Sequence, residues 1–384
     1  MLAGVMKDLL RQEIAATSET WVVKVGTRVL TRNDGQLNEE RVAQLAQELH
    51  ELFNAGKRVA LVSSGAVGAG MGKLGIAKRP ADLAHLQAVA AVGQSRLMWA
   101  YDRALQACGR PAAQILLTAQ DLDHRTRYLN VRNTIRTLFE YGAVPIINEN
   151  DTVSVEELQI TFGDNDRLAA LVTNLLRAPL LVILSDVAGL YDRDPIDPAA
   201  QVISTVKQID DSVFDLVRDH QTGLSKGGMG SKLRAAKICT AAGENLIVAS
   251  GREPGTLAKI LAGENVGTLF LAQGASVTSW KRWIGYTVQP RGYLVVDEGA
   301  HRAVITKGRS LLPIGVKEVH GTFTKGDIVA LRTPDGVEFA RGLINYTSDE
   351  SQRIIGLKST DILATLGHRP YDEIIHRDNL VVTP

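Results

Sequence analysis

The sequence has few cysteines, almost no net charge and no long apolar run. Only two cysteines, Cys108 and Cys239, occur in 384 residues, and both fall within apolar helical patterns. A disulfide framework is therefore excluded, and we expect buried reduced thiols rather than a redox or metal pair. The formal net charge of +1 gives no electrostatic reason to expect tight binding to nucleic acid or to a membrane surface.

Membrane-spanning and export signals are missing as well. No apolar run approaches the roughly 20 residues that span a bilayer. The N-terminal segment contains Lys7, Arg11 and Glu13 and lacks the apolar core of a signal peptide. We therefore expect a soluble, cytoplasmic protein. A chain of 384 residues favours two domains over one.

What the sequence does contain is an alternation of strand-like apolar runs and helical patterns over residues 21–270. This alternation predicts an α/β fold with an open, mainly parallel sheet and helices on both faces. Residues 1–20 are expected to form a short helical extension. From about Leu271 short strands with turn signals replace the alternation, which predicts a small, mostly β second domain over residues 280–372.

The stretch from Val144 to Asp166 is unusually polar for its position. A strand-like run, 144–147, leads directly into N-E-N-D at 148–151, and G-D-N-D at 163–166 starts the next helical pattern. A helix cap by Asp164 explains one of these acids. It does not explain four acids and three amides beside a buried strand, because buried polar groups are costly unless they bind something. We expect a pocket for a polar molecule with an amino group or a cation.

Two lysines occupy positions that suit a phosphate. Lys24 interrupts the apolar run 21–26, where a structural ion pair is the alternative explanation. Lys232 follows the glycine-rich segment K-G-G-M-G-S at 226–231 and opens a helical pattern. Helix-start N–H groups and ammonium groups both suit phosphate, whereas a mobile linker would account for the glycines alone.

Further polar groups follow other predicted strands. The loop S-S-G-A-V-G-A-G at 63–70 follows the run 58–62, fits neither the Walker nor the dinucleotide-binding spacing, and has a tight turn as its alternative explanation. Ser185 and Asp186 follow the run 179–184. Ligands bind at the carboxyl ends of parallel strands, so all these groups can converge. Two lysines, two glycine loops and a polar pocket favour phosphoryl transfer.

Five segments resemble the motifs of the amino-acid kinase family and follow the same order along the chain. They are V-V-K-V-G, V-S-S-G-A, I-N-E-N-D, F-G-D-N-D and G-G-M-G-S-K. Towards the C-terminus V-D-E-G-A, G-R-S-L-L-P and F-T-K-G-D resemble a PUA domain, a module known from RNA-modifying enzymes. The combination resembles the branch that phosphorylates the γ-carboxylate of glutamate in proline biosynthesis, with ATP as co-substrate and Mg²⁺. It implies a kinase domain over residues 21–270 and a PUA domain over 280–372.

The resemblance implies a role for each matching residue. Lys24 and Lys232 match the lysines that neutralise the transferring phosphoryl group, and Asp166 matches the aspartate that positions them. The implied glutamate contacts are Ser64, Asp151 and Asn165. The implied ATP contacts are Lys24, Ser185, Asp186, Lys226, Gly227, Gly228, Met229, Gly230, Ser231 and Lys232. The loop departs from the family pattern at Lys226, where threonine is usual, and at Gly230. No residue is implied as a metal ligand.

The reaction that the resemblance implies needs no general base, because a free glutamate side chain titrates near ~4.3 and is ionised at neutral pH. A sibling kinase acting on acetylglutamate, aspartate, carbamate or UMP is one alternative. An RNA-binding protein led by its PUA domain is another, although residues 288–370 carry only 11 Lys/Arg against 9 Asp/Glu. Feedback inhibition by proline and a homo-oligomeric state are further expectations.

Overall fold

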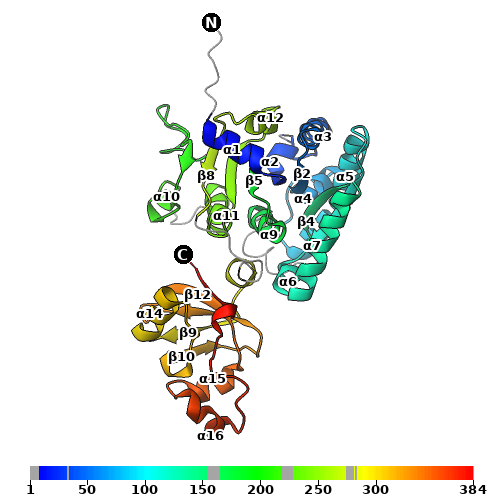
Figure 1. The fold of residues 1–384 in the computed structure, drawn as a ribbon. Coiled ribbons are helices and arrows are strands. Elements are labelled where there is room, and N and C mark those ends of the chain that lie inside the picture. The colour runs from blue at the N-terminus through cyan, green and yellow to red at the C-terminus, as the bar shows by residue number, and fades with distance from the viewer. Residues whose placement is uncertain are drawn as a thin grey trace. The chain divides into compact units, whose positions relative to one another are not determined.

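The computed structural model describes residues 8–32, 34–153, 165–217, 228–273, 281 and 283–383. The chain divides into two compact units, Met1–Ala275 and Ser276–Pro384 (Figure 1). Each unit has its own cluster of buried apolar side chains. The expected ranges 21–270 and 280–372 fall one in each unit, while their ends stay predictions.

The first unit contains an eight-stranded sheet with the strand order β3-β4-β2-β1-β5-β7-β8-β6. Neighbouring strands are parallel except for β7 and β8, which are antiparallel. The predicted open, mainly parallel sheet is thereby confirmed. The strands are β1 (Thr20–Val25), β2 (Arg58–Ser63), β3 (Ala112–Leu117), β4 (Val144–Glu149), β5 (Leu180–Ser185), β6 (Thr205–Val206), β7 (Asn245–Ser250) and β8 (Thr268–Phe270).

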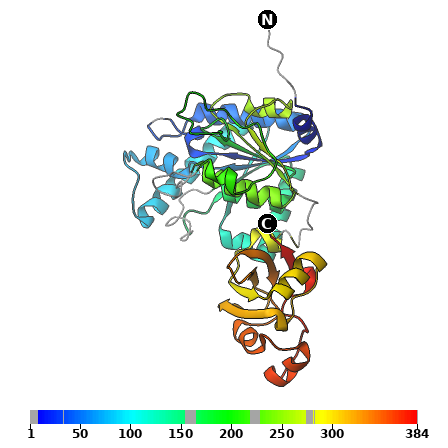
Figure 2. The same cartoon turned by 90° about the vertical axis from the view of Figure 1, so that its left-hand side faces the viewer.

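Helices cover both faces of this sheet, as predicted (Figure 2). The described helices are α1 (Leu9–Thr17), α2 (Thr27–Leu30), α3 (Glu39–Asn54), α4 (Ala66–Leu74), α5 (Leu83–Gln106), α6 (Ala119–Asp123), α7 (Arg125–Glu140), α9 (Asn165–Leu176), α10 (Asp211–Asp215), α11 (Met229–Ala241) and α12 (Thr256–Leu261). Successive side chains of a strand point to opposite faces. Trp21, Val23 and Val25 of β1 pack with α3 and α5, so Lys24 points to the other face, where α9 packs.

The N-terminal helix α1 is tied to the edge of this unit. Asp8 caps it, and α1 packs against α12. The buried Arg11 guanidinium donates to the carbonyl oxygens of Val266, Ser204 and Gly267 at 2.7, 2.6 and 3.0 Å. Because the buried Arg11 joins α1 to these three carbonyl groups, α1 is part of the packed unit.

The second unit is built on a five-stranded sheet with the order β10-β9-β11-β12-β13. Its elements confirm the predicted small, mostly β domain. They are the π-helical turn η1 (Trp283–Thr287), β9 (Gly292–Val296), α14 (Glu298–Lys307), η2 (Pro313–Gly315), β10 (Val316–Gly321), β11 (Ile328–Arg332), β12 (Glu338–Leu343), α15 (Ser348–Ile354), η3 (Ser359–Asp361), α16 (Ile362–Leu366), η4 (Arg377–Asn379) and β13 (Leu380–Val382).

One expectation about the cysteines is wrong. Both thiols are free, and Cys239 is buried in α11 as expected, but Cys108 is only half-buried. It lies in the turn that follows α5, where its thiol donates to Gln47 Oε1 at 3.7 Å. Cys108 therefore lies two residues beyond the end of α5, although the apolar pattern predicted that it would lie inside a helix. In the described part of the chain no helix is long and apolar enough to cross a membrane.

Candidate active site

The centre of the site is a buried group of three charges. Lys24 of β1 places its Nζ 2.6 Å from Asp166 Oδ1, and Lys232 of α11 places its Nζ 3.1 Å from Asp166 Oδ2. Ser231 donates its hydroxyl to Asp166 Oδ2 at 2.7 Å. All four side chains are buried. Three residues from distant parts of the chain thus meet as the sequence analysis expected.

The electrostatics of this group favour an anion. Burial raises the pKa of Asp166, but the charges of Lys24 and Lys232 outweigh burial and lower that pKa to about 2. Asp166 is therefore ionised at neutral pH. Two ammonium groups then face one carboxylate, and one positive charge remains in excess. A buried charge without a partner is costly, and an arriving phosphate would supply that partner.

Local sequence explains why these side chains lie where they do. Asp166 stands in the first turn of α9, where the helix dipole stabilises an acid, and the apolar residues that follow are buried. Helix α11 begins directly after Gly228, whose φ of +82° is a conformation that glycine adopts readily. This turn sets the direction of α11, so Lys232 in its first turn points at Asp166.

A hydrogen-bonded cluster of polar side chains, Ser64, Gln94, Asn148 and Asn165, adjoins the three charges and is called the polar cluster. Asn165 donates its Nδ2 to Ser64 Oγ at 2.9 Å and to Asn148 Oδ1 at 3.1 Å. Asn148 in turn donates to Gln94 Oε1 at 2.9 Å. Within the described residues Asn165 Oδ1 is buried without a hydrogen-bond partner. A free acceptor beside three fixed amide and hydroxyl groups suits a ligand with an amino group.

Asp151 lies in the turn after β4, two residues beyond Glu149. Burial lowers the pKa of Arg79, and the charge of Asp151 opposes that change, so the two charges are near enough to interact. Arg79 belongs to the loop between α4 and α5. The sequence analysis missed Arg79 and Gln94. A lone arginine in a loop has no distinguishing pattern, whereas Gln94, which directly follows the small and apolar segment 90–93, was a signal that could have been used.

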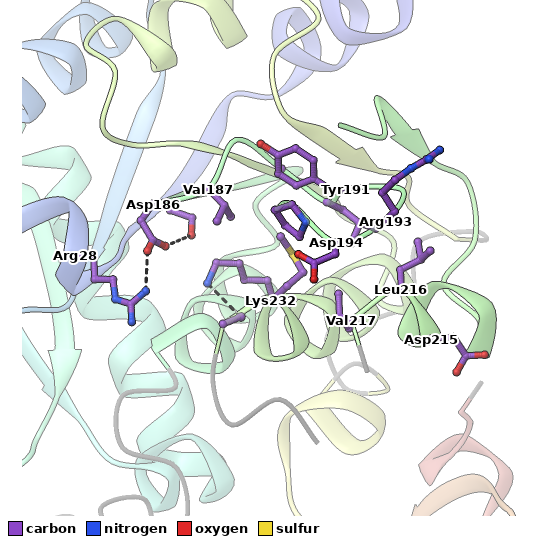
Figure 3. A pocket seen from close by; sticks show the side chains of 16 residues that line it. Arg28, Asp186, Val187, Tyr191, Arg193, Asp194, Asp215, Leu216, Val217 and Lys232 are labelled. Atoms are coloured by element: carbon purple, nitrogen blue, oxygen red, sulfur yellow. Dashed lines mark hydrogen bonds and ion pairs between the residues drawn. The ribbon is translucent and has the colours of Figure 1, made fainter. Parts of the chain in front are cut away.

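A cavity of about 820 Å³ lies on the other side of Lys232. Such a volume is typical of small-molecule sites. Figure 3 shows Lys232 between Arg28 and Asp186 on one side and Tyr191 and Asp194 on the other. Arg28 Nη1 pairs with Asp186 Oδ2 at 3.0 Å, and Ser185 donates its hydroxyl to Asp186 Oδ1 at 3.2 Å.

Some of the residues expected to bind ATP line this cavity, and others do not. Ser185, Asp186, Gly228, Met229 and Lys232 line it. Ser231 turns to Asp166 instead, and Gly230 is buried inside α11. Of the residues that the sequence analysis linked to the site, Asp164, Lys226 and Gly227 lie outside the described part of the chain. The roles of all these residues stay predictions.

The cavity also contains groups that the sequence analysis did not assign. Arg28 comes from α2, which begins one residue after the strand that carries Lys24 ends, and its side chain is 80% exposed. Further lining residues are Val187, Gly189, Leu190, Tyr191, Arg193, Asp194, Pro195, Asp215, Leu216 and Val217. Among the described residues no group of three or more His, Cys, Asp or Glu side chains could hold a metal ion.

Comparison with known proteins agrees with this geometry. The chain matches the family described as "Amino acid kinase family" over residues 19–250 and the PUA domain over residues 292–366. A glutamate 5-kinase of Rhodopirellula baltica is 49% identical over 373 residues, which are 97% of this chain and 96% of the relative. A glutamate 5-kinase of Caldanaerobacter subterraneus is 46% identical and covers 94% of this chain and 97% of the relative.

A third relative, the glutamate 5-kinase of Syntrophotalea carbinolica, is 46% identical and covers 97% of this chain and 100% of the relative. These identities extend over both units. The resemblance seen in five short motifs is thereby confirmed, and the chain belongs to the amino acid kinase family, within the group of glutamate 5-kinases that end in a PUA domain.

Proposed function

We propose that the protein transfers the γ-phosphoryl group of ATP to the γ-carboxylate of L-glutamate. The products are ADP and γ-glutamyl phosphate, and the reaction is the first step of proline biosynthesis. Family membership supports this function. The observation that carries it is the position of the three buried charges. Asn165 of the polar cluster and Asp166 are consecutive residues, and Lys232 belongs both to the charge group and to the cavity.

The mechanism follows from this arrangement. A glutamate bound by the polar cluster presents its γ-carboxylate to the γ-phosphate of an ATP in the cavity. Both groups are anionic, so the main barrier is their repulsion. Lys24 and Lys232 neutralise charge on the phosphoryl group during transfer, and Asp166 keeps both ammonium groups in place. An oxygen of the carboxylate bonds to phosphorus as the bond to ADP breaks, and no proton needs to move.

Recognition of free glutamate needs groups for its ammonium and its α-carboxylate. Asn165 Oδ1 and Asp151 are acceptors for an ammonium group. The guanidinium of Arg79 beside Asp151 suits the α-carboxylate, and Ser64 Oγ is a further contact. Acetylglutamate has no ammonium group, so Asp151 favours glutamate over that substrate.

Mg²⁺ fits the cavity as an ion carried by the nucleotide. Mg²⁺ usually keeps several waters and binds one or two carboxylates together with substrate phosphates. Asp186, Asp194 and Asp215 line the cavity, and one of them with the phosphates is a sufficient set. When bound, the ion would neutralise phosphate charge. Proline inhibition, RNA binding by the PUA domain, a homo-oligomeric state and a cytoplasmic location stay predictions.

An ADP-release assay coupled to NADH oxidation tests the function. Glutamate, acetylglutamate, aspartate, carbamate and UMP are offered in parallel with ATP and Mg²⁺. Hydroxylamine converts an acyl phosphate into a hydroxamate, which identifies the product. We expect ADP release and hydroxamate formation with glutamate at a kcat/KM well above that of the other acceptors. A preference for another acceptor would contradict the proposed substrate.

A further inference from the structure

A cluster of four arginines lies on the first unit at the edge of the sheet where the strands begin. Arg58 is the first residue of β2, and Arg177 follows the last residue of α9. Arg132 and Arg136 are one turn apart on α7, which packs against α9 and β4. The candidate active site lies at the opposite edge, where β1, β4 and β5 end.

The register of the sheet supports this grouping. Arg58 pairs with Thr20, and the next residue of that strand, Trp21, pairs with Leu180 of β5. The start of β2 and the residues just before β5 are therefore separated by one strand only. Arg177 stands three positions before Leu180, at the C-terminal end of a helix that packs on β1 and β2.

Charges within the cluster repel one another. The pKa of Arg136 is lowered by partial burial and then by the positive charges of Arg132, Arg177 and Arg58. Among the described residues, the four arginines form one ion pair, in which Arg58 Nη2 lies 2.9 Å from Oε2 of the exposed Glu19. The Nε of Arg132 is buried and has no hydrogen-bond partner among the residues that the structure describes. Like charges four residues apart also destabilise a helix. The cluster therefore opposes folding.

Backbone conformation adds to this cost. Arg177 is the only described non-glycine residue with a positive φ, which is 54°. It stands just beyond α9, where glycine is the usual residue because it lacks a Cβ. The turn itself is an ordinary helix end, in which Ala178 donates its N–H to Thr173 O at 3.0 Å. The chain thus carries an arginine where glycine would be less strained and where a fourth charge joins three others.

We propose that Arg58, Arg132, Arg136 and Arg177 form a binding site for the polyphosphate group of a small molecule. Guanidinium groups bind phosphate through two parallel hydrogen bonds, and arginine suits this geometry better than lysine. A polyphosphate has negative charge on every phosphate. An extended peptide places its side chains alternately on opposite faces, so acidic residues would match four clustered charges less well.

Inorganic tripolyphosphate is the probe, titrated calorimetrically into the full chain. A non-hydrolysable ATP analogue at saturating concentration first blocks the nucleotide cavity. The test variant combines Arg136→Ala with Arg177→Gly, and the control is Arg103→Ala, an exposed arginine of α5 that lies over the Trp99 ring. We expect one further tripolyphosphate per chain in the wild type and in the control. The double variant should bind at least about tenfold more weakly, by analogy with lost charged contacts.

Two further readouts separate a ligand site from a structural role. Without ligand the double variant should melt at a higher temperature than the wild type, because both the repulsion and the left-handed arginine are gone. Its glutamate kinase activity should equal that of the wild type. A failure of the proposed kinase function would leave the binding result intact, so the two outcomes are distinguishable.

Several results would overturn the proposal. The wild type could bind no additional tripolyphosphate. The double variant could bind tripolyphosphate with unchanged affinity, or it could melt at a lower temperature than the wild type. A changed oligomeric state of the double variant, measured by light scattering, would show that the cluster faces an acidic surface of a second copy. Binding of a short RNA oligonucleotide that competes with tripolyphosphate and is tighter would assign the cluster to nucleic acid.

Discussion

At the scale of single residues, the ratio of two lysines to one aspartate explains how the site attracts a phosphate. Two lysines and no acid would leave two buried positive charges unpaired, at a high cost in folding free energy. Two lysines and two acids would cancel the attraction for a phosphate. One carboxylate between two ammonium groups, at 2.6 and 3.1 Å, holds both in position and leaves one charge for the substrate.

We predict that Lys232→Met lowers kcat by about 10²–10³-fold, by analogy with the loss of one preorganised transition-state contact. The physical reason is the missing neutralisation of the transferring phosphoryl group. The control is Lys237→Met, an exposed lysine of the same helix. Coupled ADP release measures kcat, and circular dichroism checks the fold. A near-normal kcat would remove Lys232 from the mechanism.

Asp166→Asn tests the charge group by its pH dependence. The folded pKa of Asp166, about 2, lies below its unfolded value, so its stabilising contribution is complete above about pH 4 and is lost as the pH falls towards 2. The variant should be less stable than the wild type by about 3–5 kcal/mol at pH 7. That difference should shrink by about 2 kcal/mol towards pH 2. Urea unfolding at several pH values measures it.

A difference in stability between the two proteins that is independent of pH from 5 to 2 would show that Asp166 is not held ionised by the two lysines. The same measurement on Asp210→Asn serves as a control for acid effects elsewhere, because that residue is an exposed helix cap.

Asp151→Asn should raise the KM for glutamate at least about tenfold and leave the KM for ATP nearly unchanged. A contact that is equal in the ground state and the transition state affects KM alone. Steady-state kinetics with each substrate varied in turn provide the measurement. Arg79→Gln should show the same pattern, because the charge of Asp151 acts on Arg79. A loss of ATP affinity in either variant would place the pair at the nucleotide or the metal ion.

At the scale of elements, the Ser64 loop is held by two helices that approach backbone to backbone. A Cβ on Gly70 of α4 would lie 1.9 Å from Val89 O of α5, and a Cβ on Gly93 of α5 would lie 1.7 Å from Ala66 O. Neither contact can exist without separating the helices. Because α4 begins two residues after Ser64, its packing on α5 sets the position of Ser64 in the polar cluster.

We therefore predict that Gly70→Ala destabilises the protein by about 1–3 kcal/mol, as overpacked cores do, and raises the KM for glutamate. The matched control in the same helix is Gly72→Ala, whose Cβ would lie 3.0 Å from Cγ of the flexible Gln36 side chain and 3.6 Å, an ordinary van der Waals distance, from its Cα. That substitution should be neutral or slightly stabilising. Urea unfolding and glutamate titration of both variants make the comparison. Equal behaviour of the two variants would contradict the close packing of α4 on α5.

At the scale of the whole molecule, chemistry and the second unit are separable. Every residue given a role in phosphoryl transfer lies between Lys24 and Lys232, within the unit Met1–Ala275. That unit has its own apolar core, formed mainly by β1, β2 and β5 with α3 and α5. The second unit has another core around β9, β11 and β12.

A chain truncated after Ala275 should therefore fold and phosphorylate glutamate. Its kcat should stay within about threefold of the full chain, since the cut falls between two independently packed units and removes no assigned contact. Inhibition by proline and the demand for Mg²⁺ are measured alongside, because a domain without chemistry can still regulate. A soluble, folded truncation without kinase activity would show that the second unit completes the site.

Much of this fold could be predicted from the sequence because the relevant signals are local. The apolar runs of β1, β2, β4 and β5 have strand length, and glycine or polar residues follow them directly. Parallel strands bring their carboxyl ends to one edge, so Lys24, Ser64, Asn148 and Asp186 were expected to converge before any distance was known.

The sequence by itself thus determined the alternation of strands and helices, the division into two parts, the family and most of the groups at the strand ends. Which side chains pair with each other was decided by the tertiary structure alone. Asn165 donates to Ser64, 101 positions away, Arg28 pairs with Asp186, and the charge of Asp151 acts on Arg79. Such pairings depend on strand order and helix packing, which join distant segments, whereas the periodicity of side chains reports only on neighbours along the chain.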